Sequence, residues 1–345
     1  MMRKAWIDYI KLIAMFLVVV YHTPPRYDTA HEVALFNMGA PVFFFAAGYL
    51  FNISRQQSFV SFLLRRIRQI LVPYTTFFVI FYALWLVVGR RMAGPEEQSI
   101  GTLVPLWQFL KGTPDVVLGP FWFLAALFTM QLIYYPIRRF LSGFWPLAVS
   151  VLLSLSLFVL PNVPCIQWWN LDKALLYMPI YALGNFSLPT GGRQAVEDCR
   201  LADHFGFSSV SRGIIWLVLA ALGLGFLTVA PLKMEASTAY VLAPLAVILA
   251  LPFYTSLCRW MASRHLMDRL ALTVGVGSIT YLALQNYLIG VIKMVVARVF
   301  GQSILDENIL IKIFVPIMVM ILIYPFAVLI DRHMPWLLGK KKNTL

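Results

Sequence analysis

The chain has 345 residues, of which 60% are hydrophobic and 12% are charged, and its mean hydropathy is +0.78. A soluble domain of this size cannot bury so much apolar surface, so the composition excludes a soluble globular protein and indicates a polytopic membrane protein. The formal net charge is +13. The basic residues lie in short loops between apolar segments and not in one continuous stripe. We therefore attribute the charge to membrane orientation and expect no nucleic-acid partner.

Apolar stretches of about 17 to 25 residues predict an all-α integral membrane protein with about ten transmembrane helices. We expect one transmembrane domain over residues 1–345, because the longest loops, at 90–119 and 189–212, have no room for a separate domain. The predicted spans are 7–22, 33–52, 70–89, 120–138, 143–161, 174–188, 213–230, 239–257, 273–296 and 309–330.

The distribution of positive charge predicts the orientation of these spans. With a cytoplasmic N-terminus, the inner segments carry 18 Lys and Arg residues and the outer segments carry seven. Such an excess over short loops is typical of the cytoplasmic side, so both termini are predicted to be cytoplasmic. The first apolar segment follows Arg3 and Lys4 as a signal peptide does, but it lacks a small-residue cleavage site. We interpret it as a retained span.

The three cysteines, Cys165, Cys199 and Cys258, are far apart and lack CxxC spacing. Neither a zinc cluster nor a disulfide framework is indicated, and we expect no metal.

The first span combines an apolar helix with a stripe of ionisable residues. Lys11 and His22 are eleven positions apart, which returns to within about 20° of the same helix face, and Asp8 lies about 40° from His22. Intramembrane ionisable groups usually face a bundle interior or a wet cavity. The alternative is that Asp8 and Lys11 form an ion pair at the helix end, and that His22 lies at the outer interface.

Two further stretches each have two alternative roles. The sequence "FLLRRIRQILVPY" at 62–74 places an arginine cluster on the predicted inner face. It is either an anchor for anionic headgroups or a clamp for a phosphorylated ligand. The aromatic run "GPFWFLAALF" at 119–128 is either an interfacial belt or the rigid wall of a narrow ligand channel.

Polar residues also interrupt the ninth predicted span, "GSITYLALQNYLIGVIK". Such side chains often hydrogen-bond between transmembrane helices, so we expect mainly a structural role for them. They are Ser278, Tyr281, Gln285 and Asn286.

The order of four motifs resembles the acyltransferase 3 family of membrane acyltransferases. The motifs are Lys-x10-His within "IDYIKLIAMFLVVVYH", then "MGAPVFFFAAGYLF", "RRIRQILVPY" and "PFWFL". The resemblance implies a ten-span enzyme that moves an acyl group, most often acetyl, from acyl-coenzyme A to a hydroxyl of a sugar or another cell-surface molecule. The resemblance implies no metal, and it implies that acyl-coenzyme A is a co-substrate of the enzyme.

The resemblance also implies roles for particular residues. His22 matches the catalytic histidine and Lys11 its basic partner, and Asp8 joins them because it shares their stripe. The basic motif associated with coenzyme A corresponds to Arg65, Arg66 and Arg68, and Tyr74 and Trp122 belong to the matching motifs as further cofactor-binding residues.

The chain departs from the family pattern at three places. Ala47 precedes Gly48 where serine is common, Gln69 stands where many members have arginine, and the late-span histidine is missing near "YLALQN". The second departure leaves open which arginine dominates.

We therefore expect a multi-pass O-acyltransferase of the cell (inner or plasma) membrane, with His22 as the general base. Its expected partners are acyl-coenzyme A, most often acetyl-coenzyme A, a glycan or glycolipid acceptor, and membrane lipids. The alternative function is a transporter or flippase for a lipid-linked glycan or small molecule. A third is a scaffold whose arginines bind only headgroups, but it leaves the register of Lys11 and His22 unexplained.

Overall fold

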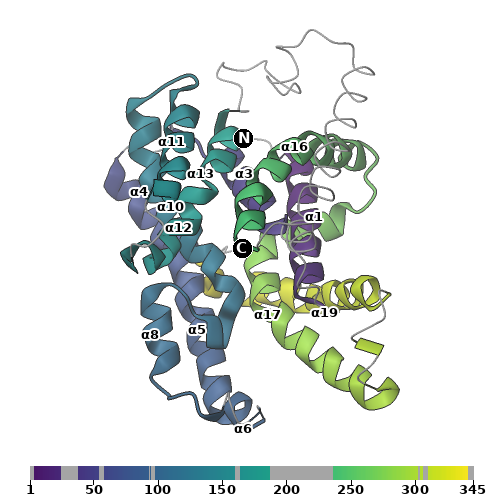
Figure 1. Ribbon diagram of the computed structural model, residues 1–345. Coiled ribbons are helices and arrows are strands. Elements are labelled where there is room, and N and C mark those ends of the chain that lie inside the picture. The colour runs from purple at the N-terminus through teal and green to yellow at the C-terminus, as the bar shows by residue number, and fades with distance from the viewer. Residues whose placement is uncertain are drawn as a thin grey trace. The chain divides into compact units, whose positions relative to one another are not determined.

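The computed structural model describes residues 4–24, 38–53, 58–92, 94, 98–159, 164–186, 236–301, 304–305 and 310–340. Every regular element within these ranges is a helix (Figure 1). The chain divides into two compact units. Unit 1 comprises Met1–Phe51 with Ile180–Val328, and unit 2 comprises Asn52–Pro179 with Leu329–Leu345.

The first helix of the chain is central to unit 1. Helix α1 (Ala5–His22) packs against α3 (Gly39–Leu50), α16 (Ala236–Ser263) and α17 (Asp268–Phe300), and its contact with α17 is the most extensive. Half of α1 is buried inside the protein although the helix is long enough to cross a membrane. Its apolar side chains therefore pack mainly against other helices of unit 1.

Glycines allow two other helices of unit 1 to approach closely. A Cβ added to Gly48 of α3 would lie 1.9 Å from the carbonyl oxygen of Tyr181 in α13 (Met178–Phe186). A Cβ added to Gly184 of α13 would lie 2.2 Å from the carbonyl oxygen of Phe45. Small residues at helix contacts are typical of membrane proteins, where close backbone approach supplies much of the packing energy. The two glycines thus form a reciprocal contact between α3 and α13.

A long, nearly uninterrupted helical rod carries the arginine motif in unit 2. It consists of α4 (Phe59–Arg66), a π-helical stretch (Ile67–Leu71), α5 (Val72–Leu84), a second π-helical stretch (Trp85–Gly89) and α6 (Arg90–Met92). Ser58 begins it with a capping box, in which the Ser58 and Ser61 side chains bond each other's backbone amides. Short π-helical stretches occur frequently at functional sites.

The remaining helices of unit 2 follow along the chain. They are α8 (Val104–Lys111), α9 (Asp115–Leu118), a 3₁₀ turn (Gly119–Phe121), α10 (Trp122–Phe140), α11 (Trp145–Val159), a 3₁₀ segment (Pro164–Asn170) and α12 (Leu171–Leu176). Helix α19 (Ile311–His333) passes from unit 1 into unit 2, where a 3₁₀ turn (Pro335–Leu338) follows it.

The segment expected to be an outer loop at 90–119 contains helices that pack back against the long rod. Tyr82 donates a hydrogen bond to the carbonyl of Thr102, at 2.8 Å. The ring of Phe109 in α8 stacks on Phe78, with centroids 4.2 Å apart. Helix α8 therefore extends along α5 to the level of Tyr74, which Phe109 also contacts.

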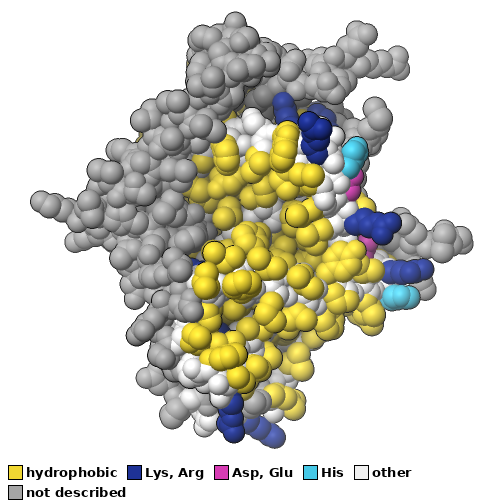
Figure 2. Space-filling model, turned by 90° about the vertical axis from the view of Figure 1, so that its right-hand side faces the viewer, with side chains coloured by type: hydrophobic (Ala, Val, Ile, Leu, Met, Phe, Trp, Pro, Cys, Tyr) yellow, Lys and Arg dark blue, Asp and Glu magenta, His cyan; other side chains and the backbone are white. Residues whose placement is uncertain are grey.

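Apolar helices indicate a membrane protein. Within the described residues, five helical segments are long and apolar enough to span a bilayer: Ala5–His22, Phe59–Gly89, Asp115–Phe140, Asp268–Phe300 and Ile311–His333. Many side chains of α17 and α19 are apolar and exposed, and Figure 2 shows a face on which hydrophobic side chains predominate. An exposed apolar surface of this extent suits lipid contact.

These helices agree with the predicted spans in part. Helices α3, α11, α12, α13 and α16 overlap the predicted spans at 33–52, 143–161, 174–188 and 239–257, whereas 213–230 lies outside the described residues. The count of ten and the location of both termini stay predictions.

Candidate active site

Helix α1 ends at His22, as the prolines that follow it predict. Thr23, fully buried, is extended, and its hydroxyl donates to the carbonyl of Val19 at 2.8 Å. The half-buried His22 is thus the last helical residue, and its ring lies edge-on to that of Tyr21. Because α1 is helical from Ala5 to His22, the predicted register of Asp8, Lys11 and His22 is retained.

Asp8 and Lys11 both contact Gly275 of α17. Lys11 Nζ donates to the carbonyl oxygen of Gly275 at 3.3 Å. A Cβ added to Gly275 would lie 2.6 Å from Asp8 Oδ1, so a larger residue there would displace this buried aspartate. The Ser278 hydroxyl donates to the same carbonyl at 3.1 Å. The ionisable stripe of α1 therefore faces a polar stripe on α17.

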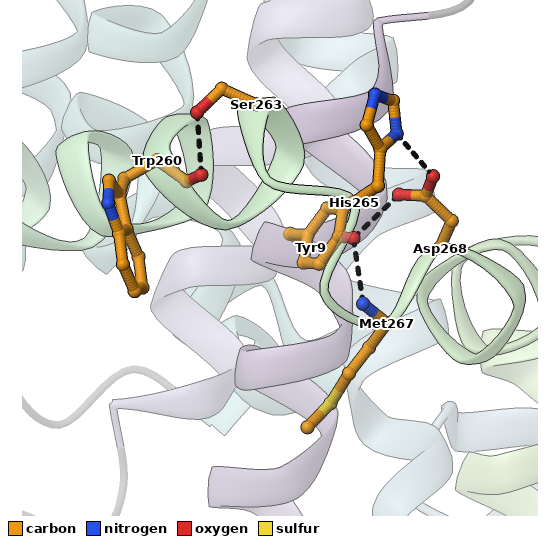
Figure 3. A network of polar contacts seen from close by, with 6 residues as sticks. All are labelled: Tyr9, Trp260, Ser263, His265, Met267 and Asp268. Atoms are coloured by element: carbon orange, nitrogen blue, oxygen red, sulfur yellow. Dashed lines mark hydrogen bonds and ion pairs between the residues drawn. The ribbon is translucent and has the colours of Figure 1, made fainter.

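A polar network fixes the start of α1 beside the start of α17 (Figure 3). The Tyr9 hydroxyl donates to Asp268 Oδ1 at 2.6 Å and accepts the Met267 amide proton at 3.1 Å. Asp268 Oδ2 pairs with His265 Nδ1 at 2.6 Å. Helical side chains lean toward their own N-terminus, so Tyr9 reaches back to Asp268 while Asp8 contacts Gly275, two turns later on α17. These contacts show that α1 and α17 run in the same direction.

The three predicted arginines lie at the junction of α4 and the π-helical stretch. Arg65 and Arg68 are exposed, whereas Arg66 is half-buried, stacks over the Phe62 ring at 5.3 Å and donates to Gln69 Oε1 at 3.0 Å. Gln69, which departs from the family pattern, therefore orients a neighbouring guanidinium. The exposed heads of Arg65 and Arg68 can bind phosphate.

The C-terminal turn of unit 2 packs against the backbone of this motif. A Cβ added to Gly339 would lie 1.8 Å from the carbonyl oxygen of Arg68, and Gly339 has a φ of 64°. Thr76 donates to the carbonyl of Leu337 at 3.0 Å. This contact cannot be predicted from the sequence, because nothing local marks a glycine 271 positions away as a neighbour of Arg68.

Aromatic rings surround Tyr74, another predicted cofactor-binding residue. Its ring is buried and lies 5.0 Å from Phe109, 6.0 Å from Phe121 and 5.9 Å from Trp169, centroid to centroid. Its hydroxyl donates to the Phe109 carbonyl at 3.0 Å. Phe121, from the predicted aromatic run, is fully buried here, so this part of the run is a wall inside unit 2 and not an interfacial belt.

Trp122 lies beneath Lys173, which directly precedes the predicted span at 174–188. Lys173 Nζ is 4.5 Å from the centre of the Trp122 ring and 3.1 Å from Asn170 Oδ1. Burial lowers the pKa of the Lys173 ammonium, and the nearby carboxylates of Asp172 and Asp115 act in the opposite direction. The wall of Tyr74 and the Lys173–Trp122 pair belong to one region, since Trp169 directly precedes Asn170.

The backbone of that region is strained. Trp169 and Asn170 both have positive φ, 52° and 49°, and non-glycine residues rarely adopt this conformation. The amide of the fully buried Asn170 donates to the Gly112 carbonyl at 2.6 Å, which holds the strained turn in place. Strained residues of this kind cluster at ligand-binding and active sites.

The described residues contain no group of three or more His, Cys, Asp or Glu side chains that could hold a metal ion. Cys258 is buried as a free thiol. The predicted catalytic residues Asp8, Lys11 and His22 lie in unit 1, and the predicted cofactor-binding residues Arg65, Arg66, Arg68, Tyr74 and Trp122 lie in unit 2.

Comparison with protein families identifies the chain. A profile described as an acyltransferase domain matches residues 4–331, which include nearly all of both units. The chain belongs to the acyltransferase 3 family. Comparisons with curated proteins and with solved structures found no match. Membership in the acyltransferase 3 family implies acyltransferase activity, typically on carbohydrates, and agrees with the apolar helices of a membrane protein.

Proposed function

We propose that the protein is an acyl-coenzyme A-dependent O-acyltransferase of the cell membrane that acylates a hydroxyl of a cell-surface glycan or glycolipid. Acetyl is the expected acyl group. The observation that carries the proposal is the α1 stripe: a histidine ends a buried apolar helix, and Asp8 and Lys11 on the same stripe are held against Gly275. Family membership supplies the reaction class.

In this proposal His22 is the general base. A sugar hydroxyl is a poor nucleophile, and a neutral imidazole can remove its proton as the oxygen attacks the thioester carbonyl. The carbon–sulfur bond then breaks, and the protonated imidazole returns the proton to the departing thiolate, giving the ester and coenzyme A. Lys11 and Asp8 act as positioning residues, because both hold α1 against α17.

The acyl donor is assigned to unit 2. Coenzyme A carries phosphates at one end, and the guanidinium heads of Arg65 and Arg68 are exposed, with Arg66 oriented by Gln69. Its long thin arm suits an aromatic wall, which Tyr74 and its neighbours provide, and Trp122 directly follows Phe121 of that wall.

Two variants test the proposal with separate readouts. Membrane vesicles from a strain lacking the gene, supplied with the protein and radiolabelled acetyl-coenzyme A, report transfer to glycans or glycolipids. Calorimetric titration of the purified protein with acetyl-coenzyme A reports binding. His22→Ala should retain binding but lose about 10²- to 10⁴-fold in transfer rate, because general-base catalysis is removed.

The second variant replaces Arg65, Arg66 and Arg68 together by Gln. It should weaken binding and make the remaining affinity less dependent on salt, because the charged phosphate contacts are lost. Transfer within a few-fold of wild type in a folded His22→Ala protein would contradict the general-base role. Unchanged affinity of the triple variant would return the arginines to the headgroup-anchor interpretation.

A further inference from the structure

Gln285 is a buried amide without a partner among the residues that the structure describes. Its side chain is fully buried in α17, and neither Oε1 nor Nε2 makes a hydrogen bond to any described group. Among the other polar residues of this helix, Tyr281 donates to the Met320 carbonyl of α19 at 3.4 Å, Asn286 is exposed, and the buried Thr280 hydroxyl also makes no hydrogen bond to a described group. Tyr281 thus makes the cross-helix bond expected of a packing residue, whereas Gln285 does not.

The helical register places Gln285 on the polar stripe of α17. Ser278 and Gln285 are seven residues apart, which leaves them about 20° apart on the helix face. Ser278 bonds the Gly275 carbonyl, which also accepts the bond from Lys11. Gln285 therefore lies about 20° from Ser278 and about 80° from Gly275, on the half of α17 that includes its contact with Asp8.

Because α1 and α17 run in the same direction, the position of Gln285 along its helix axis can be compared with that of His22. Asp8 and Gly275 lie side by side, His22 is fourteen residues further along α1, and Gln285 is ten residues further along α17. At about 1.5 Å per residue these distances are roughly 21 Å and 15 Å, so Gln285 lies within about one to two helical turns of His22 in depth. Since α17 is the main neighbour of α1, Gln285 lies close to the level of His22 along the same helix pair.

We propose that Gln285 is a catalytic residue whose Nε2–H donates a hydrogen bond to the thioester carbonyl oxygen during transfer. This oxygen becomes negatively charged when the acceptor oxygen attacks, while His22 takes the acceptor proton. A neutral donor fixed in a dry site stabilises that charge without reorganising, whereas a buried amide with no ligand role only destabilises the fold. The proposal rests on the proposed function, which supplies the thioester and the base.

Gln285→Met separates a catalytic role from the absence of any ligand role, because it keeps the length of the side chain and removes both polar ends. The variant should unfold at the same temperature as wild type or a higher one, and it should bind acetyl-coenzyme A with unchanged affinity. Its transfer rate at saturating acetyl-coenzyme A should fall about 10²- to 10³-fold, the usual loss for one such donor. Asn286→Leu, at the exposed neighbouring position, is the matched control and should remain active.

Gln285→Glu is a second variant that keeps both size and polarity. A buried carboxyl group is held protonated and can donate one hydrogen bond, but it loses that proton as the pH rises. The transfer rate of Gln285→Glu should therefore fall with rising pH where that of wild type does not. Wild-type transfer by Gln285→Met would overturn the proposal, and so would a Gln285→Glu protein whose pH profile matches that of wild type. A fully active His22→Ala protein would instead contradict the proposed function, so the two failures are distinguishable.

Discussion

Gly339 supports the arginine motif through a contact that no side chain tolerates. We expect Gly339→Ala to displace the Arg68 backbone, because its Cβ would lie 1.8 Å from the Arg68 carbonyl oxygen. The affinity for acetyl-coenzyme A, measured by calorimetry, should fall about tenfold, the effect of roughly 1.4 kcal/mol. Gly143 is the matched control, since its φ of 63° is nearly the same but a Cβ there meets nothing within 4 Å. Equal affinities in both alanine variants would contradict a supporting role for Gly339.

For individual residues of the site, positions that depend on neighbours in the sequence were predicted better than positions that depend on distant residues. The register of Lys11 and His22 and the end of α1 followed from helix periodicity and from the prolines after the helix. Periodicity did not predict the close contact of Asp8 with Gly275. It also did not predict the half-buried position of Lys173 over Trp122. Both depend on residues far away in the chain. The roles of these residues in catalysis and binding stay predictions.

The contact between α3 and α13 explains why glycine stands in the middle of "AAGYL", at position 48. We expect Gly48→Ala to separate these helices, because the added Cβ would lie 1.9 Å from the Tyr181 carbonyl oxygen. The loss should be about 1–3 kcal/mol of folding free energy, as for other overpacked positions, and thermal unfolding in detergent micelles measures it.

Gly290→Ala is the control for this prediction, since a Cβ there meets no atom within 4 Å. On the exposed face of α17 it should stabilise by about 0.5–1 kcal/mol, because alanine restricts the unfolded chain and favours helix. If both variants lowered the unfolding temperature equally, the close-approach explanation would be wrong. The length of the apolar stretches predicted spans at both α3 and α17, but it could not show which glycine meets a neighbouring helix.

For the whole molecule, the charge distribution predicts the orientation in the membrane. Reporter fusions after residues 60, 200 and 345 should all give a cytoplasmic signal, because 18 Lys and Arg residues lie in the predicted inner segments and seven in the outer ones. An extracytoplasmic signal at residue 60 would contradict both this topology and the assignment of coenzyme A to the arginines.

Hydropathy predicted an all-helical membrane protein but not how the segment at 90–119 folds. Its helix α8 packs along α5, and Phe109 reaches the Tyr74 ring. Hydropathy measures the average affinity of a segment for lipid, and a polar stretch that returns to pack against a span has no distinctive average. The division into two units likewise depends on long-range contacts.

The π-helical stretch at Ile67–Leu71 is a place where the rod can lose one residue and stay helical. A π turn holds one more residue than an α turn, so deleting a residue there would let the rod close into regular α-helix. Because the wider turn accommodates the extra residue, everything before the deletion would keep nearly its present direction relative to Tyr74. The rod would remain folded with Arg65 and Arg66 on their present faces, so relatives that lack one residue here should hold the acyl donor with the same arginines.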